Sequence, residues 1–146
     1  MKEIRTEIKI EAPADEVWSI LTDFPRHADW NPFIREISGE LHPGAQLQVI
    51  LGSPGQRKMR FKPTVQMVEP AKAFRWLGHL FIPGLFDGEH IFELETAGKN
   101  ATRFVQREKF SGILVGIFRK SLDTDIKNGF DAMNKALKHE VEKVSR

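Results

Sequence analysis

Cysteine and tyrosine are both absent from this sequence of 146 residues. Without cysteine, the chain can form no disulfide bond, no thiolate zinc site and no cysteine nucleophile. Without tyrosine, no reaction mechanism that depends on a phenolic hydroxyl is open to it. Composition alone therefore excludes two side chains with common catalytic and metal-binding roles.

Long hydrophobic runs are missing as well. No uncharged stretch approaches the ~20 residues that a membrane-spanning helix needs, and the charged, alternating segment 1–12 differs from the apolar core of a signal peptide. The formal net charge is only +2, with acids and bases interleaved, whereas nucleic-acid-binding proteins usually gather lysine and arginine on one face. We expect a cytoplasmic protein with no nucleic-acid partner and no stable membrane insertion.

The short motifs of several enzyme classes are also absent. The sequence has neither a phosphate-binding loop nor the G-x-G-x-x-G fingerprint of dinucleotide binding, which argues against a redox enzyme. Residues 52–55, GSPG, are not the G-x-S-x-G turn that carries a nucleophilic serine. His27 and Asp29 have no partner at metal-ligand spacing, because the five histidines are scattered. We predict no cofactor and no metal site.

What the chain does contain is a large supply of apolar and aromatic side chains. It is 40% hydrophobic and has 11 phenylalanines and 3 tryptophans. A chain of this length buries roughly 68–70% of its unfolded surface. We therefore predict a single domain over residues 1–146 with a substantial core, either monomeric or homodimeric.

Alternation of apolar and charged residues predicts about seven strands. Pro63 falls inside one of them and indicates an edge position or a bulge there. The overlapping segment QRKMRFK (56–62) has four basic residues. We interpret these as an outer face that discourages aggregation, with a phosphate or membrane patch as the alternative. The expected strands cover residues 3–12, 34–39, 45–51, 58–68, 73–80, 88–95 and 102–110.

Helical spacing appears at both ends of the chain. A short helix is predicted before Pro25, followed by a helical turn and loop that carries Trp30 and Phe33, so two short helical segments follow the first strand. After residue 112, an apolar stripe predicts one long helix. This order describes an α+β domain in which the C-terminal helix covers one face of an antiparallel sheet. The stripe comprises Ile117, Phe118, Leu122, Ile126, Phe130, Met133, Leu137, Val141 and Val144.

Two strands place polar side chains on a face that should be buried. In GEHIFELE (88–95), His90 alternates in line with Phe92 and Leu94, opposite three glutamates. In TRFVQREKF (102–110), Gln106 and Glu108 are in line with phenylalanines. A three-residue loop, 98–100, keeps the inward faces of the two strands matched.

This hairpin predicts a specific register, with Asn100 in the left-handed conformation. His90 then faces Glu108, and a slip of two residues would place it opposite Phe110 instead. The remaining expected pairs are Phe92 with Gln106 and Leu94 with Phe104.

Three explanations for these polar groups remain open. Glu108 and His90 form a satisfied core pair, or the polar groups meet water or a ligand in a solvated cavity, or His90 and Glu108 act as catalytic acid and base. Burying an unpaired polar group costs ~1–3 kcal/mol, so a packed core without partners for them is excluded.

Four segments resemble the START/Bet v 1-like (SRPBCC) superfamily, and within it the polyketide cyclase/dehydrase-type proteins of bacteria. Each motif is loose, but together they cover essentially the whole chain in order. They are IEAPADEVWSILTDFPRHADWNPFI (10–34), GLFDGEHIFELE (84–95), REKFSG (107–112) and GFDAMNKALKHEVE (129–142).

The resemblance implies a helix-grip fold, in which a curved antiparallel sheet wraps around the long C-terminal helix and encloses a deep, mostly apolar cavity. It implies that Trp30 lies near the mouth of this cavity. The loop FIPGLFDG (81–88), with Phe81, Leu85 and Phe86, either folds over the core or forms a lid with Gly84 and Gly88 as hinges. Superfamily members bind lipids, sterols, hormones or polyketides, and some catalyse cyclisation or dehydration, so the fold does not select one activity.

We therefore expect a module that binds a hydrophobic small molecule of lipid, polyketide or aromatic type. A cyclase or dehydratase using His90 or Glu108 is the alternative, and a protein-interaction or stress-response module is a second one. The expected ligand-binding residues are Trp30, Met59, Phe61, Phe74, Trp76, His90, Phe92, Phe104, Gln106, Glu108, Phe118, Ile126, Phe130 and Met133.

Overall fold

Two antiparallel sheets form the framework of the protein. The computed structural model describes residues 2–52, 57–80 and 83–145. The larger sheet has the strand order β1-β8-β7-β6-β5 and the smaller one the order β2-β3-β4. The strands are β1 (Lys2–Ile10), β2 (Ile34–Ser38), β3 (Gln48–Leu51), β4 (Met59–Phe61), β5 (Thr64–Glu69), β6 (Ala73–Leu80), β7 (Phe86–Gly98) and β8 (Ala101–Ser111).

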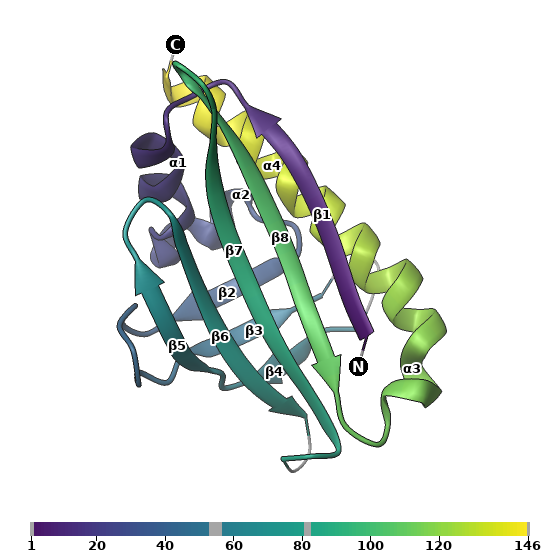
Figure 1. Ribbon diagram of the computed structural model, residues 1–146. Helices are drawn as coiled ribbons and strands as arrows, with labels where there is room; N and C mark the ends of the chain where they lie inside the picture. The colour runs from purple at the N-terminus through teal and green to yellow at the C-terminus, as the bar shows by residue number, and fades with distance from the viewer. Residues whose placement is uncertain (1, 53–56, 81–82, 146) are drawn as a thin grey trace.

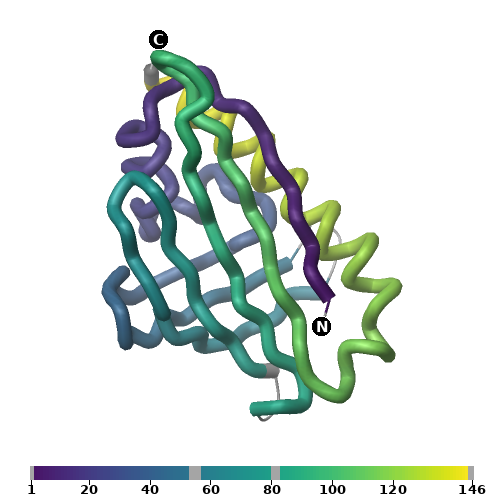
Figure 2. Tube along the Cα trace, in the orientation of Figure 1, coloured from purple at the N-terminus to yellow at the C-terminus, as the bar shows by residue number. Residues whose placement is uncertain are grey.

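The helices and the smaller sheet lie together behind the larger sheet (Figure 1). The C-terminal helix runs diagonally behind β1 and β8, and the small sheet crosses behind β7 and β8, as the trace in Figure 2 also shows. Helical segments are α1 (Ala14–Leu21), the 3-10 turn η1 (Phe24–Arg26), α2 (His27–Trp30), α3 (Val115–Ser121), the π-helical turn η2 (Leu122–Ile126) and α4 (Lys127–Ser145). This arrangement confirms the expected α+β, helix-grip class.

The prediction of one strand over residues 58–68 is wrong, because this segment forms two strands, β4 and β5, on either side of Pro63. Proline has no amide hydrogen to donate to a ladder, so it ends one strand before the next begins. The two pieces belong to different sheets, which gives eight strands in the described residues where about seven were predicted. A bridge between Gln46 and Thr64, with Val65 N donating to Ala45 O at 2.8 Å, joins the sheets at this corner.

The predicted register of β7 and β8 is confirmed, with His90 opposite Glu108. The turn that produces it differs from the prediction. Gly98 pairs with Ala101, so the loop has two residues, and a bulge between Thr96 and Gly98 restores the matching of faces. The positive φ belongs to Gly98, at 150°, and Asn100 has none.

The single long C-terminal helix that was predicted is divided by η2. A π-helical turn holds an extra residue and therefore rotates the preceding helix relative to the buried face of α4. This rotation accounts for the exposure of Ile117 (74%) and Phe118 (39%), which the stripe had placed inward. Val144, at the far end of the stripe, is also exposed. The central members, Leu122, Phe130, Met133, Leu137 and Val141, are buried as predicted.

Aromatic side chains fill the concave side of the larger sheet in its upper half. Phe74 and Phe92 stack with their ring centroids 4.5 Å apart. Phe92 also stacks on the ring of His90, at a centroid distance of 4.2 Å. Phe130 of α4 completes the group at 5.0 Å from His90 and 5.5 Å from Phe33. No helix in the described residues is long and apolar enough to cross a membrane.

Candidate functional site

An apolar cavity of about 280 Å³ occupies the lower half of the concave side. It lies between the larger sheet, strands β3 and β4 of the smaller sheet, and the α3–η2 segment. Five of the residues expected at a ligand site line it, and they are Met59, Phe61, Glu108, Phe118 and Ile126.

Two glycines stand side by side on neighbouring strands in the wall of the cavity. Gly78 of β6 and Gly88 of β7 are direct partners in the sheet and both line the cavity. One step further along, the corresponding pair is Trp76 and His90, and there the interior is packed. A Cβ on Gly78 would meet the ring of Phe61 at 3.1 Å, so this glycine also lets β4 approach the sheet.

Glu108 is the point at which the cavity meets the polar groups of the core. Its carboxylate is mostly buried, with 15% of the side chain exposed, and Oε1 lies 3.3 Å from Nδ1 of His90, which is 1% exposed. The other ring nitrogen of His90, Nε2, lies 2.8 Å from Oε1 of Gln106. The second carboxylate oxygen, Oε2, lies over Gly88, where a Cβ would collide with it.

The hydrogen bonds continue from Gln106 to the far side of the core. Gln106 Nε2 donates to Asn134 Oδ1 and Asn134 Nδ2 donates to Thr6 Oγ1, both at 2.9 Å. Thr6 then donates back to the carbonyl of Gln106 at 3.3 Å. Thr6 and Asn134 were not among the predicted site residues, although each is a polar residue at an inward position of its element. We call Glu108, His90, Gln106, Asn134 and Thr6 the polar chain.

The direction of these bonds fixes the protons. An amide oxygen can only accept, so Nε2 of His90 carries a proton that it donates to Gln106. Nδ1 of His90 faces Oε1 of Glu108, and the two can form a hydrogen bond only through a proton that one of them carries. Glu108 is thus both the partner of the buried His90 and part of the cavity wall.

Comparison with known proteins adds the family. The sequence profile of the family described as "Polyketide cyclase / dehydrase and lipid transport" matches residues 1–142. The chain belongs to this family. A search of curated protein sequences found no significant match.

Solved structures share the fold of this polyketide cyclase/dehydrase-type chain at low sequence identity. The Zhui aromatase/cyclase of Streptomyces sp. R1128 is 18% identical with a TM-score of 0.81, covering 99% of this chain and 96% of its own. A norcoclaurine synthase of Thalictrum flavum is 15% identical with a TM-score of 0.76, covering 99% and 96%. A START superfamily protein of Mycobacterium smegmatis is 20% identical with a TM-score of 0.73, covering 97% and 98%.

The other residues expected to contact a ligand do not line this cavity. His90 and Gln106 lie behind its wall, connected to it through Glu108. Trp30, expected near the mouth, packs on His27 with ring centroids 4.8 Å apart. The remaining large side chains point inward, as the alternation predicted, but they pack against one another in the core and do not line the cavity. These are Phe74, Trp76, Phe92, Phe104, Phe130 and Met133.

His27 in this family member is a satisfied core histidine. Nε2 donates to the Leu21 carbonyl at 2.6 Å, and Asn31 Nδ2 donates to Nδ1 at 3.1 Å. Burial lowers the pKa of His27 below its usual value, since a charged ring would lose its hydration. Within the described ranges, no group of three or more metal-ligating side chains occurs.

The start of β7 is a wall of the cavity rather than part of a loop with two hinges. Phe86 lines the cavity and packs edge-to-face on Phe118, with ring centroids 5.4 Å apart. Gly88 is paired within the sheet on both sides, so the expected hinge there is wrong. Gly84 has a φ of 94°, and Asp87 accepts its amide hydrogen. Phe81 lies outside the described residues.

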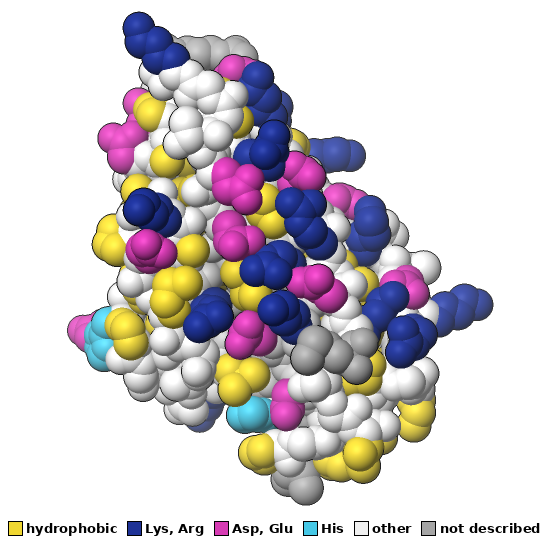
Figure 3. Space-filling model, viewed as in Figure 1, with side chains coloured by type: hydrophobic (Ala, Val, Ile, Leu, Met, Phe, Trp, Pro, Cys, Tyr) yellow, Lys and Arg dark blue, Asp and Glu magenta, His cyan; other side chains and the backbone are white. Residues whose placement is uncertain are grey.

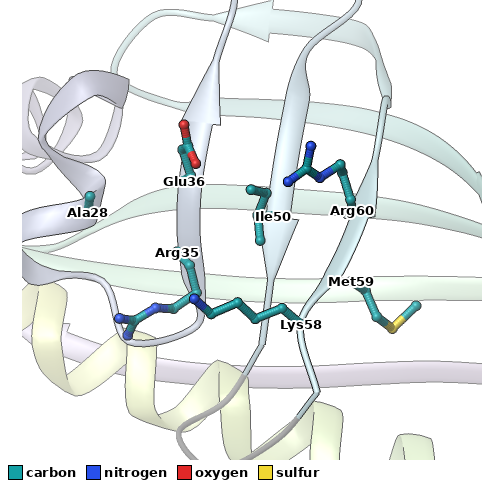
Figure 4. Close-up of a pocket in the computed structure, with 7 residues that line it drawn as sticks. All are labelled: Ala28, Arg35, Glu36, Ile50, Lys58, Met59 and Arg60. Atoms are coloured by element: carbon teal, nitrogen blue, oxygen red, sulfur yellow. The ribbon is translucent and has the colours of Figure 1, made fainter.

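A second hollow, of about 460 Å³, lies on the outer face of the smaller sheet (Figure 4). Arg35, Lys58 and Arg60 surround it, and Figure 4 shows Met59 pointing away from them. The alternation predicted for the basic segment therefore places its charges outward, on exposed positions. This open, charged surface lacks the buried polar group and apolar wall that a small-molecule site usually has.

Proposed function

We propose that this protein binds a compact, largely apolar molecule that carries one hydrogen-bond donor. The observation that supports this function is an apolar cavity with a carboxyl group in its wall, held from behind by a buried histidine. The apolar wall supplies affinity by removing ligand surface from water, and Glu108 orients the ligand.

The size of the cavity limits the ligand class. Ligand pockets usually measure about 300–1,000 Å³, and this cavity has about 280 Å³. The volume suits one or two rings better than a long acyl chain or a tetracyclic polyketide. Met59 and Phe118 line the cavity and are also exposed to solvent, by 42% and 39%. They therefore mark the mouth of the cavity.

Glu108 selects for a donor such as a hydroxyl or an amine. Oε1 is occupied by His90, whereas Oε2 has no hydrogen-bond partner in the described part of the chain. A hydrogen bond to a charged group contributes about 1.5–3 kcal/mol, which corresponds to roughly ten- to hundredfold in affinity.

The test is equilibrium binding of a matched pair of probes, 2-naphthol and naphthalene, followed by calorimetry or tryptophan fluorescence. We expect 2-naphthol to bind about tenfold or more tightly than naphthalene. Glu108→Gln should reduce this preference while leaving naphthalene binding unchanged, and the exposed Glu95→Gln on the same sheet serves as the control. Ile126→Trp, which fills the cavity, should abolish both. Binding of neither probe, or binding unaffected by Ile126→Trp, would refute the proposal.

The contact between the His90 imidazole and the Glu108 carboxyl supports a second candidate function, proton transfer in a cyclase or dehydratase reaction. Glu108 would take a proton from a carbon or hydroxyl of a poly-carbonyl ligand, and His90 would stabilise the pair as its charge changes. Neighbours named as an aromatase/cyclase and a norcoclaurine synthase have the same fold. Turnover lost in Glu108→Gln with ligand affinity retained would support catalysis. Tight binding of poly-carbonyl compounds without any turnover in the wild type would oppose it.

A further inference from the structure

Exposed hydrophobic side chains are concentrated at the end of the molecule where the cavity opens. Among the described residues, five large hydrophobic side chains are exposed, and Val144 is the one that lies elsewhere. The other four are Ile113 (77%), Ile117 (74%), Met59 (42%) and Phe118 (39%), which we call the tip surface. Figure 3 shows hydrophobic side chains along the lower edge, where Figure 1 places α3 and the start of β7.

The packing of the protein does not require this apolar surface. Val115 and Leu122, each 4% exposed, already anchor the segment to the core. Ile113 and Ile117 are exposed, so apolar side chains also face solvent at the start of this segment. Single exposed hydrophobic residues are ordinary, but a cluster of them beside a cavity mouth marks an interaction site.

The tip surface is held in a fixed position. Ile113 N donates to Gly84 O at 3.2 Å, and Leu114 N donates to Leu85 O at 3.0 Å. The segment before β7 therefore supports the residues that precede α3. Because Phe118 also lines the cavity, anything that covers the tip surface also covers the cavity mouth.

Two exposed basic side chains adjoin the tip surface. From residue 112 to residue 121 the chain has two basic residues, Arg119 and Lys120, and no acidic one. Both side chains are exposed, and neither forms a hydrogen bond or ion pair within the part of the chain that the structure describes. The two acids that follow are engaged elsewhere, because Asp123 is paired with Lys2 and Asp125 accepts a hydrogen bond from Ser121 Oγ at 3.2 Å.

We propose that the tip surface docks on an anionic lipid bilayer, with Ile113, Ile117 and Phe118 in the interface and Arg119 and Lys120 at the headgroups. Apolar side chains flanked by cations are the chemistry that such a surface recognises. Docking would place the cavity mouth against the lipid, so that an apolar ligand passes between bilayer and cavity without crossing water. This docking does not depend on the ligand, and its test needs none.

The expected contributions follow from the two kinds of contact. Each cation near an anionic headgroup increases affinity about fivefold. Each isoleucine side chain that leaves water contributes at least about tenfold. Two isoleucines and two cations therefore suffice for measurable, reversible attachment, which needs no spanning helix.

The test is flotation of the full-length protein with vesicles of phosphatidylcholine, with or without phosphatidylglycerol. We expect binding to the mixed vesicles and a loss of at least about a hundredfold in Ile113→Ser/Ile117→Ser. Arg119→Gln/Lys120→Gln should weaken binding to the mixed vesicles about tenfold or more and leave the weaker binding to phosphatidylcholine unchanged. Val144→Ser, an equally exposed position distant from the tip, is the matched control and should bind as the wild type does.

Three outcomes would overturn the proposal. They are absence of the wild type from floated mixed vesicles, vesicle binding that survives Ile113→Ser/Ile117→Ser, and sedimentation showing a dimer that this variant dissociates. The last result would assign the tip surface to a second copy of the chain. Ile126→Trp, which fills the cavity, should still bind vesicles, so failure of ligand binding and failure of docking remain distinguishable.

Discussion

Replacing Gly88 by alanine tests whether the Glu108 carboxyl is held where the structure places it. The added methyl group would collide with Oε2 of Glu108, and the next nearest atom outside this carboxylate, in the ring of Phe110, is 3.6 Å away. Glu108 therefore has to rotate away from its position over β7. Because His90 is 1% exposed, its Nδ1 then loses its partner in a place that water does not reach.

The magnitude is the difference of two opposing effects. Leaving a buried polar group without its partner costs about 1–3 kcal/mol. Alanine in the interior of a strand is more favourable than glycine by roughly 0.5–1 kcal/mol, because the unfolded chain has less freedom to lose. We expect a net loss of about 1–2 kcal/mol in the free energy of unfolding. The affinity for 2-naphthol should fall with it, since the oriented acceptor is gone.

Urea denaturation of matched variants measures this effect. Gly116 in α3 is the control, because a Cβ there has no atom within 4 Å. Gly116→Ala should increase the free energy of unfolding by about 0.5–1 kcal/mol, as expected for an unobstructed helical glycine. The two substitutions thus remove the same glycine entropy and differ in what the methyl group meets.

A double-mutant cycle isolates the contact itself. In a Glu108→Ala background the collision no longer exists, so Gly88→Ala should become neutral or stabilising, with a coupling energy of about 1–3 kcal/mol. If Gly88→Ala stabilises the wild type as Gly116→Ala does, or if its effect is the same in both backgrounds, then the carboxyl group is not fixed over Gly88. The reasoning that makes Glu108 the ligand's acceptor would then fail.

Two further predictions concern the buried polar groups. Since burial lowers the pKa of His27 from 6.5, the unfolded chain binds a proton there that the folded chain does not. Its contribution is therefore present above pH 6.5 and lost as the pH falls below it, by up to about 1.4 kcal/mol per pH unit. His27→Gln should remove that slope from acid denaturation curves, and exposed His139→Gln should keep it; an unchanged slope in His27→Gln would contradict the assignment. Asn134→Ala should cost about 2–4 kcal/mol in the free energy of unfolding, against less than about 0.5 kcal/mol for Asn100→Ala in an exposed turn; equal effects would mean that the polar chain contributes nothing to stability.

The register of the hairpin that carries the polar chain was predictable from the sequence. In each strand, one of two alternating sets of side chains must face the core, and the apolar residues show which set it is. His90 faces Glu108 in any arrangement that turns the phenylalanines of both strands inward without a slip. The detailed turn was not predictable. A two-residue loop with a bulge and a three-residue loop give the same matching of faces, and the bulge at Gly98 leaves no trace in the alternation.

The cavity was misplaced for a different reason. Alternation indicates which residues point inward, but it says nothing about whether the space that they enter is full. Phe74 and Phe92 point inward and pack on each other, whereas Gly78 and Gly88 leave room for Phe61 and for the Glu108 carboxyl beside the cavity. Finding that pair requires the register of β6 against β7, which depends on the chain between them. The π-helical turn likewise escaped notice, since three- and four-residue steps continue across it.

The polar chain explains how a carboxyl group can lie in an apolar wall without losing its position. From Thr6 to His90 each member has its hydrogen bonds satisfied inside the protein, so rotating one of them would leave another buried group unpaired. The network therefore fixes Glu108 before any ligand arrives. A ligand with a suitably placed donor would find the Glu108 carboxyl already oriented to accept its hydrogen bond. A ligand without a donor would bury Oε2 of Glu108 without a partner. If the proposed function holds, selectivity for a polar group in this cavity follows from how the core behind it is bonded.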